Sequence, residues 1–365
     1  MNTVAIKFDA FEDLKNEECQ ERILRAKKAL GNKVVILGHH YQNETVYRHA
    51  DLTGDSLKLA KYVDQLEAKY IVFLGVHFMA EVANILSRAD QITVLPDLSA
   101  GCSMADMANL AKVERTYREL SKVLDFDQTI TPITYINSAA DLKAFCGEHG
   151  GIVCTSTNAP KILDWAFQQK EKVLFFPDQH LGRWTGYKSG VSLDEMPIWD
   201  PDLPLGGLDE KTISKAKVLL WKGHCAVHQM FRPEHIKIFR DKYPDGKVIS
   251  HPESPFEVCE NSDFVGSTEY ILNTIKGAKP NTQWLVGTEL NLVNRLANEM
   301  KAEGKLVKFM SHIVCECSTM ARIDPQHLAW TLENILNDKP VNIIEVPKKE
   351  ADLARLALDR MLQVN

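Results

Sequence analysis

Long apolar runs, basic clusters and low-complexity segments are all absent from this 365-residue sequence. Without a run of about 18 apolar residues, no membrane span is expected. The N-terminus lacks an apolar core and soon turns acidic, so it is not expected to be a signal peptide. The net charge of −6 argues against nucleic acid as a partner, although an anionic small molecule remains compatible. We therefore expect a cytoplasmic globular protein with two or three domains of roughly 100–200 residues each.

The sequence does contain eight cysteines. Disulfides are rare in the cytoplasm, so buried thiols, metal ligands or nucleophiles are expected. Four of the cysteines give no further signal and are assigned to core packing, namely Cys19, Cys146, Cys154 and Cys259. The others lie in three distant segments, at Cys102, at Cys225 with His228 three residues on, and at Cys315-Glu-Cys317. Thiolate and imidazole bind soft and borderline metals well, so these segments are candidate metal ligands.

Short β-branched or apolar runs alternate with helical patterns along the chain, which predicts an α/β fold with parallel sheets. Strands are expected at 33–37, 70–74, 92–95, 130–136, within 150–158, and at 173–176, 247–250, 283–286 and 307–310. Pro132 should place its strand at an edge or irregular point of a sheet. Segment 178–215, with several Gly, Pro and Asp residues, is interpreted as an insertion or surface excursion. Functional side chains are expected beyond the carboxyl ends of the strands.

A threefold internal repeat organises these strands. Each copy has a strand ending in a polar triplet, then a second strand ending in hydroxyls at a helix start, then a cysteine. The triplets are His39-x-Tyr41, Tyr135-x-Asn137 and His251-x-Glu253, the hydroxyls are Ser56, Ser156-Thr157 and Ser267-Thr268, and the cysteines are Cys102, Cys225 and Cys317. We predict three pseudo-threefold-related parallel α/β modules, each a three-layer sandwich, around a central cluster. Their boundaries are 1–113, 114–228 and 229–365, the last including a C-terminal helix. The alternative to a threefold repeat is that these recurring features reflect only the general similarity of all parallel α/β chains.

Three cysteines near one axis suit an iron–sulfur cluster with one open iron, or a zinc ion with one open position. Cys317 is preferred to Cys315, because one intervening residue hinders both thiolates from reaching separate irons. Helix starts bearing hydroxyls favour a small ligand with carboxylates or a phosphate, although helix capping alone would explain Ser56 and Ser267. Three histidines are candidates for positive charge or proton transfer, namely His39, His228 and His251. The acid/base candidates are Tyr41 and Glu253.

Taken together, these residues resemble quinolinate synthase, the iron–sulfur enzyme of de novo NAD biosynthesis, over nearly the whole chain. The matching segments are 38–42, 54–56, 75–81, 135–137, 177–178, 221–225 with His228, 251–253, 266–268, and Cys317 with Met320. The resemblance implies three α/β domains around one 4Fe–4S cluster per chain. By position, the cluster ligands are Cys102, Cys225 and Cys317, and the fourth iron takes substrate. This chain has Ser254 where many relatives have cysteine, so that position is not expected to be a ligand.

The resemblance also implies a reaction. Iminosuccinate (iminoaspartate), supplied by L-aspartate oxidase as functional partner, condenses with dihydroxyacetone phosphate to quinolinate, and phosphate and water leave. Substrate-binding positions carried over by motif are His39, Ser56, Tyr135, Asn137, Ser156, His251, Glu253 and Thr268, and Tyr41 and Glu253 are implied to transfer protons. A zinc hydrolase using Cys225, His228 and Cys315 or Cys317 is a rival interpretation, as is an iron–sulfur redox sensor. The sequence leaves open whether the chain forms a homo-oligomer.

Overall fold

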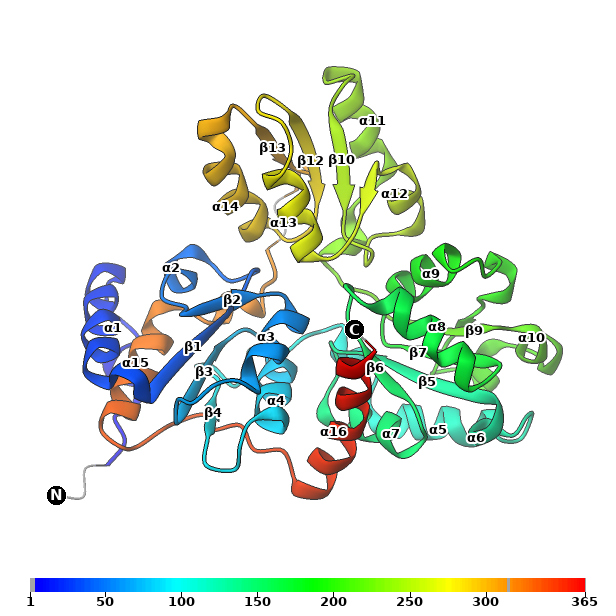
Figure 1. Cartoon of the computed structure of the whole chain (residues 1–365), viewed down its shortest axis with the longest axis horizontal. Helices are drawn as coiled ribbons and strands as arrows, with labels where there is room; N and C mark the ends of the chain where they lie inside the picture. The colour runs from blue at the N-terminus through cyan, green and yellow to red at the C-terminus, as the bar shows by residue number, and fades with distance from the viewer. Residues whose placement is uncertain (1–3, 314–315, 365) are drawn as a thin grey trace. The chain divides into compact units, whose positions relative to one another are not determined.

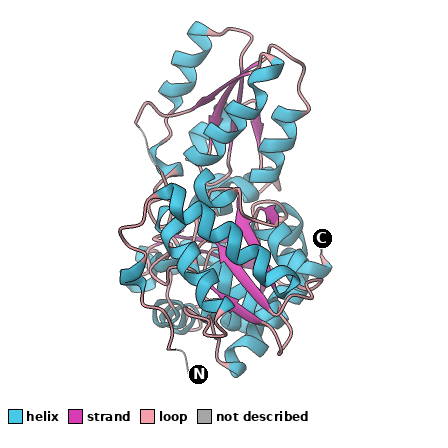
Figure 2. Cartoon of the chain, turned by 90° about the vertical axis from the view of Figure 1, so that its left-hand side faces the viewer, coloured by secondary structure: helices cyan, strands magenta, loops and turns pink. Residues whose placement is uncertain are grey.

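The computed structural model describes residues 4–313 and 316–364. The chain forms two compact units, Met1–Cys102 with Glu316–Val346, and Ser103–Cys315 with Pro347–Asn365. In Figure 2 the strands lie inside, with helices outside. The predicted class is confirmed, because three sheets of parallel strands are flanked by helices. The module boundaries and a threefold arrangement around a central cluster remain predictions.

The first unit holds one four-stranded parallel sheet in the order β2-β1-β3-β4. Its strands are β1 (Val34–His39), β2 (Leu52–Gly54), β3 (Tyr70–Leu74) and β4 (Ile92–Val94). Its helices are α1 (Asn16–Leu30), α2 (Glu44–Tyr47), α3 (Ser56–Val63), α4 (His77–Leu86) and α15 (Pro325–Leu336). Helix α1 packs on α15, and Figure 1 shows this pair across the sheet from α3 and α4. Both sheet faces are therefore covered, which explains why β1 and β3 are almost wholly buried.

The second unit holds two parallel sheets, in the orders β6-β5-β7-β9-β8 and β11-β10-β12-β13. Strands of the first are β5 (Ile130–Tyr135), β6 (Ile152–Cys154), β7 (Lys172–Phe176), β8 (Ile198–Trp199) and β9 (Val218–Trp221). Those of the other are β10 (Lys247–Ser250), β11 (Phe264–Val265), β12 (Gln283–Gly287) and β13 (Leu306–Phe309). The helices are α5 (Leu110–Leu120), α6 (Phe126–Thr129), α7 (Ala140–Glu148), α8 (Ala159–Gln169), α9 (Gln179–Lys188), α10 (Glu210–Lys215), α11 (Pro233–Lys242), α12 (Phe256–Asn261), α13 (Thr268–Lys276), α14 (Leu290–Met300) and α16 (Lys348–Gln363). Helix α16, predicted as a core-facing C-terminal helix, packs on α7.

One aspartate contact recurs in two of the sheets and supports the repeat. The backbone N–H of Ile36 in β1 donates to Asp51 Oδ2 at 2.8 Å, and the Asp51 N–H donates back to the Ile36 carbonyl at 2.8 Å. Val248 in β10 and Asp263 make the same reciprocal pair, at 2.7 and 2.9 Å. Each aspartate also forms an ion pair with a basic side chain from the helix before the first strand of its sheet. The pairs are Asp51 with Lys27 of α1 and Asp263 with Arg240 of α11. The shared Asp-x-x-Gly-x-Ser/Thr motif therefore aligns the first two strands of each sheet.

Pro132 stands where the other two sheets have the strand residue that bonds to the aspartate. Pro132 was expected at an edge or an irregular point of its sheet, and β5 is not an edge strand, because it pairs with β6 on one side and with β7 on the other. The pairing with β6 begins only at Ile133, opposite Ile152, so Pro132 meets a strand on the β7 side alone. Opposite Pro132 lies Gly151, where a Cβ would come within 2.2 Å of the Pro132 carbonyl oxygen. Pro132, which has no N–H to donate, and Gly151, which has no side chain, thus occupy the place that the aspartate contact has in the other two sheets.

Segment 178–215 is more than the surface excursion predicted from its composition. It supplies helix α9 and the edge strand β8, which pairs with β9 through Ile198 and Trp199. Trp199 is fully buried and its indole donates to Thr116 Oγ1 at 2.9 Å. Buried residues spread over several short elements give no long apolar run, which explains the error.

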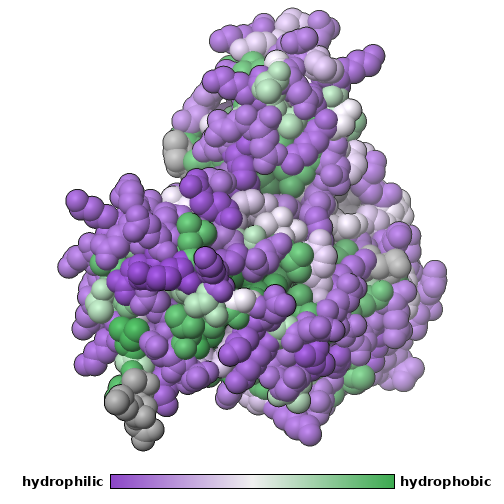
Figure 3. Space-filling view, turned by 60° about the vertical axis from the view of Figure 1, so that its left-hand side comes forward, coloured by the Kyte–Doolittle hydropathy of each residue, from purple (hydrophilic) through white to green (hydrophobic). Residues whose placement is uncertain are grey.

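Within the part of the chain that the structure describes, no helix combines the length and apolar character needed to cross a bilayer. The face drawn in Figure 3 is mostly hydrophilic, with small scattered apolar groups.

Candidate functional site

In the first unit the predicted side chains gather at the carboxyl end of β1. His39 is buried and its Nδ1 accepts from the Tyr41 backbone N–H at 3.2 Å, while the two rings meet edge to face at 4.7 Å. The neighbouring His40 instead forms a hydrogen bond with the Tyr47 hydroxyl at 2.9 Å, which is a structural contact. Ser56 begins α3, but the cap is Asp55, whose side chain accepts from the Lys58 N–H. Capping therefore does not explain the Ser56 hydroxyl.

The segments of Cys102 and Cys317 are joined within the same unit. Arg322 Nη1 donates to Ser99 Oγ at 3.0 Å, which links the two cysteine segments. Gln42 Nε2 lies 3.4 Å from Met320 Sδ, which links the second cysteine segment to the loop of His39 and Tyr41. Cys315 lies outside the described residues, so the choice between it and Cys317 is not tested.

In the second unit Glu253 is the centre of a buried polar cluster. The Tyr135 hydroxyl donates to Glu253 Oε1 at 2.6 Å, and His228 Nδ1 lies 2.9 Å from Oε2. The rings of His228 and His251 stack at 4.8 Å, and His228 Nε2 lies 3.4 Å from Thr288 Oγ1. These side chains come from the ends of β5, β10 and β12 and from the turn after Cys225. The fold therefore brings together four predicted residues, Tyr135, His228, His251 and Glu253, from two of the three repeats.

Burial and neighbouring charges determine the ionisation of this cluster. Burial acts to raise the pKa of Glu253, but His251, His228 and the Tyr135 hydrogen bond outweigh it and lower the pKa to about 2. Burial lowers the pKa of His251 to about 3, against the attraction of Glu253. At neutral pH Glu253 is therefore a carboxylate that only accepts hydrogen bonds, and His228 Nδ1 lies 2.9 Å from its Oε2.

Cys225 lies beside this cluster. Its sulfur, a ring nitrogen of His228 and a carboxylate oxygen of Glu253 all lie within 4.8 Å of one another, which is compatible with a bound metal. Burial separates the described cysteines into two groups. The three predicted ligands are partly exposed, whereas the four cysteines assigned to packing are buried. Burial raises the pKa of the Cys259 thiol to about 12 and also raises the pKa values of Cys19, Cys146 and Cys154. Among the described cysteines, the three predicted ligands are therefore the better candidates for metal binding.

The remaining predicted positions lie at helix starts and strand ends of the second unit. Asn137 follows β5, and its Oδ1 is buried without a hydrogen bond among the described residues. Ser156 is half-buried in the turn before α8. Ser267 caps α13 by accepting from the Tyr270 N–H at 3.4 Å, so the structural interpretation holds for it. Thr268 is the buried first residue of that helix.

Two residues of this region were missed by sequence reasoning. Asp178 is fully buried at the end of β7, and burial followed by the charge of Glu253 raises its pKa well above the ordinary value. Thr288 is fully buried at the end of β12. The predicted positions lie at the ends of the first two strands of each copy, whereas Asp178 and Thr288 follow the third strands, β7 and β12. The ends of the third strands would have indicated both residues.

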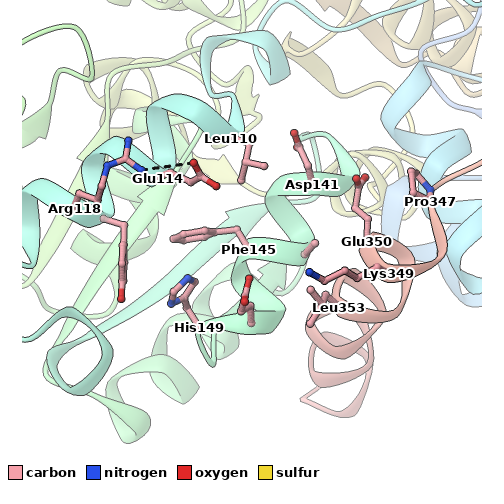
Figure 4. A pocket seen from close by; sticks show the side chains of 13 residues that line it. Leu110, Glu114, Arg118, Asp141, Phe145, His149, Pro347, Lys349, Glu350 and Leu353 are labelled. Carbon is pink, nitrogen blue, oxygen red and sulfur yellow. Dashed lines mark ion pairs between the residues drawn. The ribbon is translucent and has the colours of Figure 1, made fainter.

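A separate hollow of about 570 Å³ lies between α5, α7 and α16. Phe145 and His149 line it, with the ion pair of Glu114 and Arg118 (3.7 Å) along one side (Figure 4). Burial raises the pKa of Asp141 at its other end. None of the predicted site residues lines this hollow, so it is distinct from the candidate site.

Comparison with known proteins gives a consistent result. The family model described as "Quinolinate synthetase A protein" matches residues 21–363. The chain is 49% identical to quinolinate synthase of Acidobacterium capsulatum, over 99% of this chain and 96% of the relative. It is 51% identical to that of Herpetosiphon aurantiacus (97% and 94%) and 49% identical to that of Rhodopirellula baltica (97% and 93%). Among solved structures, a D-2-hydroxyisocaproate dehydrogenase has a TM-score of only 0.21 at 10% identity and bears no argument.

Proposed function

The chain belongs to the quinolinate synthase family, enzymes of NAD biosynthesis, and from this premise we propose that it condenses iminosuccinate with dihydroxyacetone phosphate to quinolinate, releasing phosphate and water. The observation that carries the proposal is the buried Tyr135–Glu253–His228 cluster next to Cys225, in a chain matched over residues 21–363. L-Aspartate oxidase would supply the imine as functional partner, and the cytoplasm is the proposed compartment.

We propose one 4Fe–4S cluster per chain, held by Cys102, Cys225 and Cys317. Their partial exposure, against the buried thiols of the other described cysteines, supports this choice. When bound, such a cluster supplies a Lewis acid at its open iron, which polarises a substrate hydroxyl or carboxylate.

The substrates are small anions, and the proposed binding groups are hydroxyls, an amide and imidazoles at strand ends and helix starts. In the first unit these are His39 and Ser56, and in the second Tyr135, Asn137, Ser156, His228, His251, Ser267 and Thr268. The N–H groups at the start of α13 would add to the binding of a carboxylate or phosphate. Support comes from the buried Oδ1 of Asn137, which lacks a protein partner among the described residues.

Glu253, with Tyr41 and His251, is the proposed proton-transfer group. With a pKa of about 2, Glu253 is a weak base before substrate enters. An anionic substrate would raise this pKa by repulsion between like charges and so increase its basicity. Tyr135 and His228 hold both carboxylate oxygens and fix their direction.

The test is production of quinolinate and phosphate by protein purified and reconstituted without oxygen. Iminosuccinate is generated in the assay from oxaloacetate and ammonia, so that no second enzyme is needed. We expect stoichiometric release of phosphate that depends on both substrates. A cluster-loaded protein that forms no quinolinate would contradict the proposal.

A further inference from the structure

We propose that Lys143 is a positioning residue that, through Ser138, fixes the turn that carries Tyr135 and Asn137. Lys143 lies on α7, the helix that follows this turn, residues 135–138. The inference rests on the proposed function, in which Tyr135 and Asn137 bind substrate.

Lys143 is fully buried, which is exceptional for a lysine. Its Nζ donates to the Ser138 carbonyl and lies 3.4 Å from Ser138 Oγ. Ser138 is itself fully buried, and its hydroxyl donates to the Tyr135 carbonyl at 2.8 Å and accepts from Thr134 Oγ1 at 2.8 Å. A buried chain of hydrogen bonds therefore runs from α7 to the backbone of Tyr135.

The corresponding turns of the other two sheets close through their own backbone. After β1, the Gln42 N–H donates to the His39 carbonyl at 3.0 Å, and after β10 the Ser254 N–H donates to the His251 carbonyl, also at 3.0 Å. Each histidine adds a second contact, because its Nδ1 accepts from the backbone N–H two residues further on, at 3.2 and 3.4 Å. These two turns are thus held by bonds within the turn itself.

The turn after β5 is closed in a different way. The Ser138 N–H donates to the Ile136 carbonyl at 2.9 Å, and the Tyr135 carbonyl accepts from the Ser138 hydroxyl. Tyr135 stands where the other turns have histidine, and its ring has no nitrogen that could accept from the backbone. Side chains therefore do here what the backbone does in the other two turns, and Lys143 holds the residue that supplies the hydroxyl.

The position of this turn sets a contact of the buried cluster. The Tyr135 hydroxyl donates to Glu253 Oε1 at 2.6 Å, and Asn137 lies on the same turn. A displacement of about 1 Å caused by a distant substitution can lower a rate by about 100-fold. We therefore expect loss of Lys143 to lower turnover while the cluster stays bound.

Lys143→Met tests this role in protein reconstituted without oxygen. Methionine keeps an unbranched apolar side chain and removes the donor. Hydrogen exchange followed by peptide mass spectrometry should be faster than in the wild type over residues 135–138, because the turn loses its tie to α7. We expect kcat/KM to fall by at least about 10-fold, with the iron content of the wild type.

Lys172→Met is the matched control. Lys172 is also a buried lysine, and its Nζ donates to the Ser214 and Ala216 carbonyls at 2.7 and 2.8 Å. It pairs with Ile130 at the start of β5, the opposite end of that strand from Tyr135. The control should therefore lower the melting temperature but leave kcat/KM and exchange over residues 135–138 unchanged.

A double variant shows whether Lys143 acts through Tyr135. Tyr135→Phe removes the hydroxyl that donates to Glu253. Residues that act through one another have non-additive effects, so Lys143→Met should lower kcat/KM by a smaller factor in the Tyr135→Phe protein than in the wild type. An equal factor in both proteins would overturn the inference.

The other outcomes are also distinct. Wild-type exchange over residues 135–138 in Lys143→Met overturns the inference, as does a loss of kcat/KM no greater than that of Lys172→Met. If Lys143→Met does not fold, Ser138→Ala, which removes the hydroxyl bond to the Tyr135 carbonyl, is measured in the same way, and wild-type exchange and turnover there overturn it too. Loaded wild-type protein that forms no quinolinate overturns the proposed function instead, and the exchange comparison would still show whether Lys143 holds the turn.

Discussion

Glu253→Gln tests the buried cluster most sharply. The carboxylate accepts from the Tyr135 hydroxyl at 2.6 Å and faces His228 Nδ1 at 2.9 Å. An amide of the same shape has one oxygen and one NH₂, so either the Tyr135 hydroxyl or His228 Nδ1 then faces the NH₂ instead of an oxygen. Each hydrogen bond to a charged group contributes roughly 1.5–3 kcal/mol. The loss is partly offset, because a buried charge disappears as well.

The expected change in turnover is larger than the change in stability. Removal of a general acid or base typically lowers the rate by about 10²–10⁴-fold, which corresponds to roughly 3–5 kcal/mol of activation free energy. We therefore expect kcat to fall by at least about 100-fold while iron content stays that of the wild type. The amide keeps the volume of the site, so the KM of dihydroxyacetone phosphate should change much less than kcat.

The assay is steady-state quinolinate formation without oxygen, with iron measured on the same samples. Glu260→Gln is the matched control, because Glu260 is an exposed residue of α12 in the same segment. Near-normal turnover of a fully loaded Glu253→Gln protein would remove Glu253 from the mechanism.

Three further predictions concern thiols, pH and ligand choice. In the cluster-free protein, iodoacetamide should alkylate Cys225 much faster than Cys146, whose burial raises its thiol pKa, as peptide mass spectrometry would show. Burial lowers the pKa of His49 from 6.5 to about 4, so the unfolded chain takes up a proton first as the pH falls through this range. Stability of the cluster-free protein should therefore fall by up to about 1.4 kcal/mol per pH unit, and a melting series with His49→Gln should show a smaller slope. Cys317→Ala should lose the cluster and all activity and Cys315→Ala should keep the cluster, and iron retained in Cys317→Ala would reverse the assignment.

The features that could be predicted from the sequence are those whose motifs recur along the chain. The recurrence of Asp51 and Asp263 before glycine and a hydroxyl predicted equivalent modules, and the two aspartates make the same backbone contacts. The register of β5 could not be predicted in the same way. Pro132 was expected at an edge or an irregular point, and the sequence alone does not show where the pairing with the neighbouring strand begins, which decides between the two.

The candidate site residues could be named from the sequence, but the contacts between them could not. Tyr135 and Glu253 lie 118 positions apart, and no local pattern indicates that one donates to the other. Helix capping was the alternative explanation for the Ser56 hydroxyl, yet Asp55 takes that role, because α3 begins at Ser56 itself, one residue earlier than a capping Ser56 would require. Asp178 was visible only as part of the matching segment 177–178, since no local pattern shows that Glu253 lies near enough to raise its pKa.

The central proposal is that Cys102, Cys225 and Cys317, which are partly exposed, hold an iron–sulfur cluster. The most direct measurement is the content of iron, acid-labile sulfide and zinc in protein purified without oxygen. The account predicts about four irons and four sulfides per chain and no zinc. One zinc without sulfide would contradict it and favour a zinc site at Cys225 and His228.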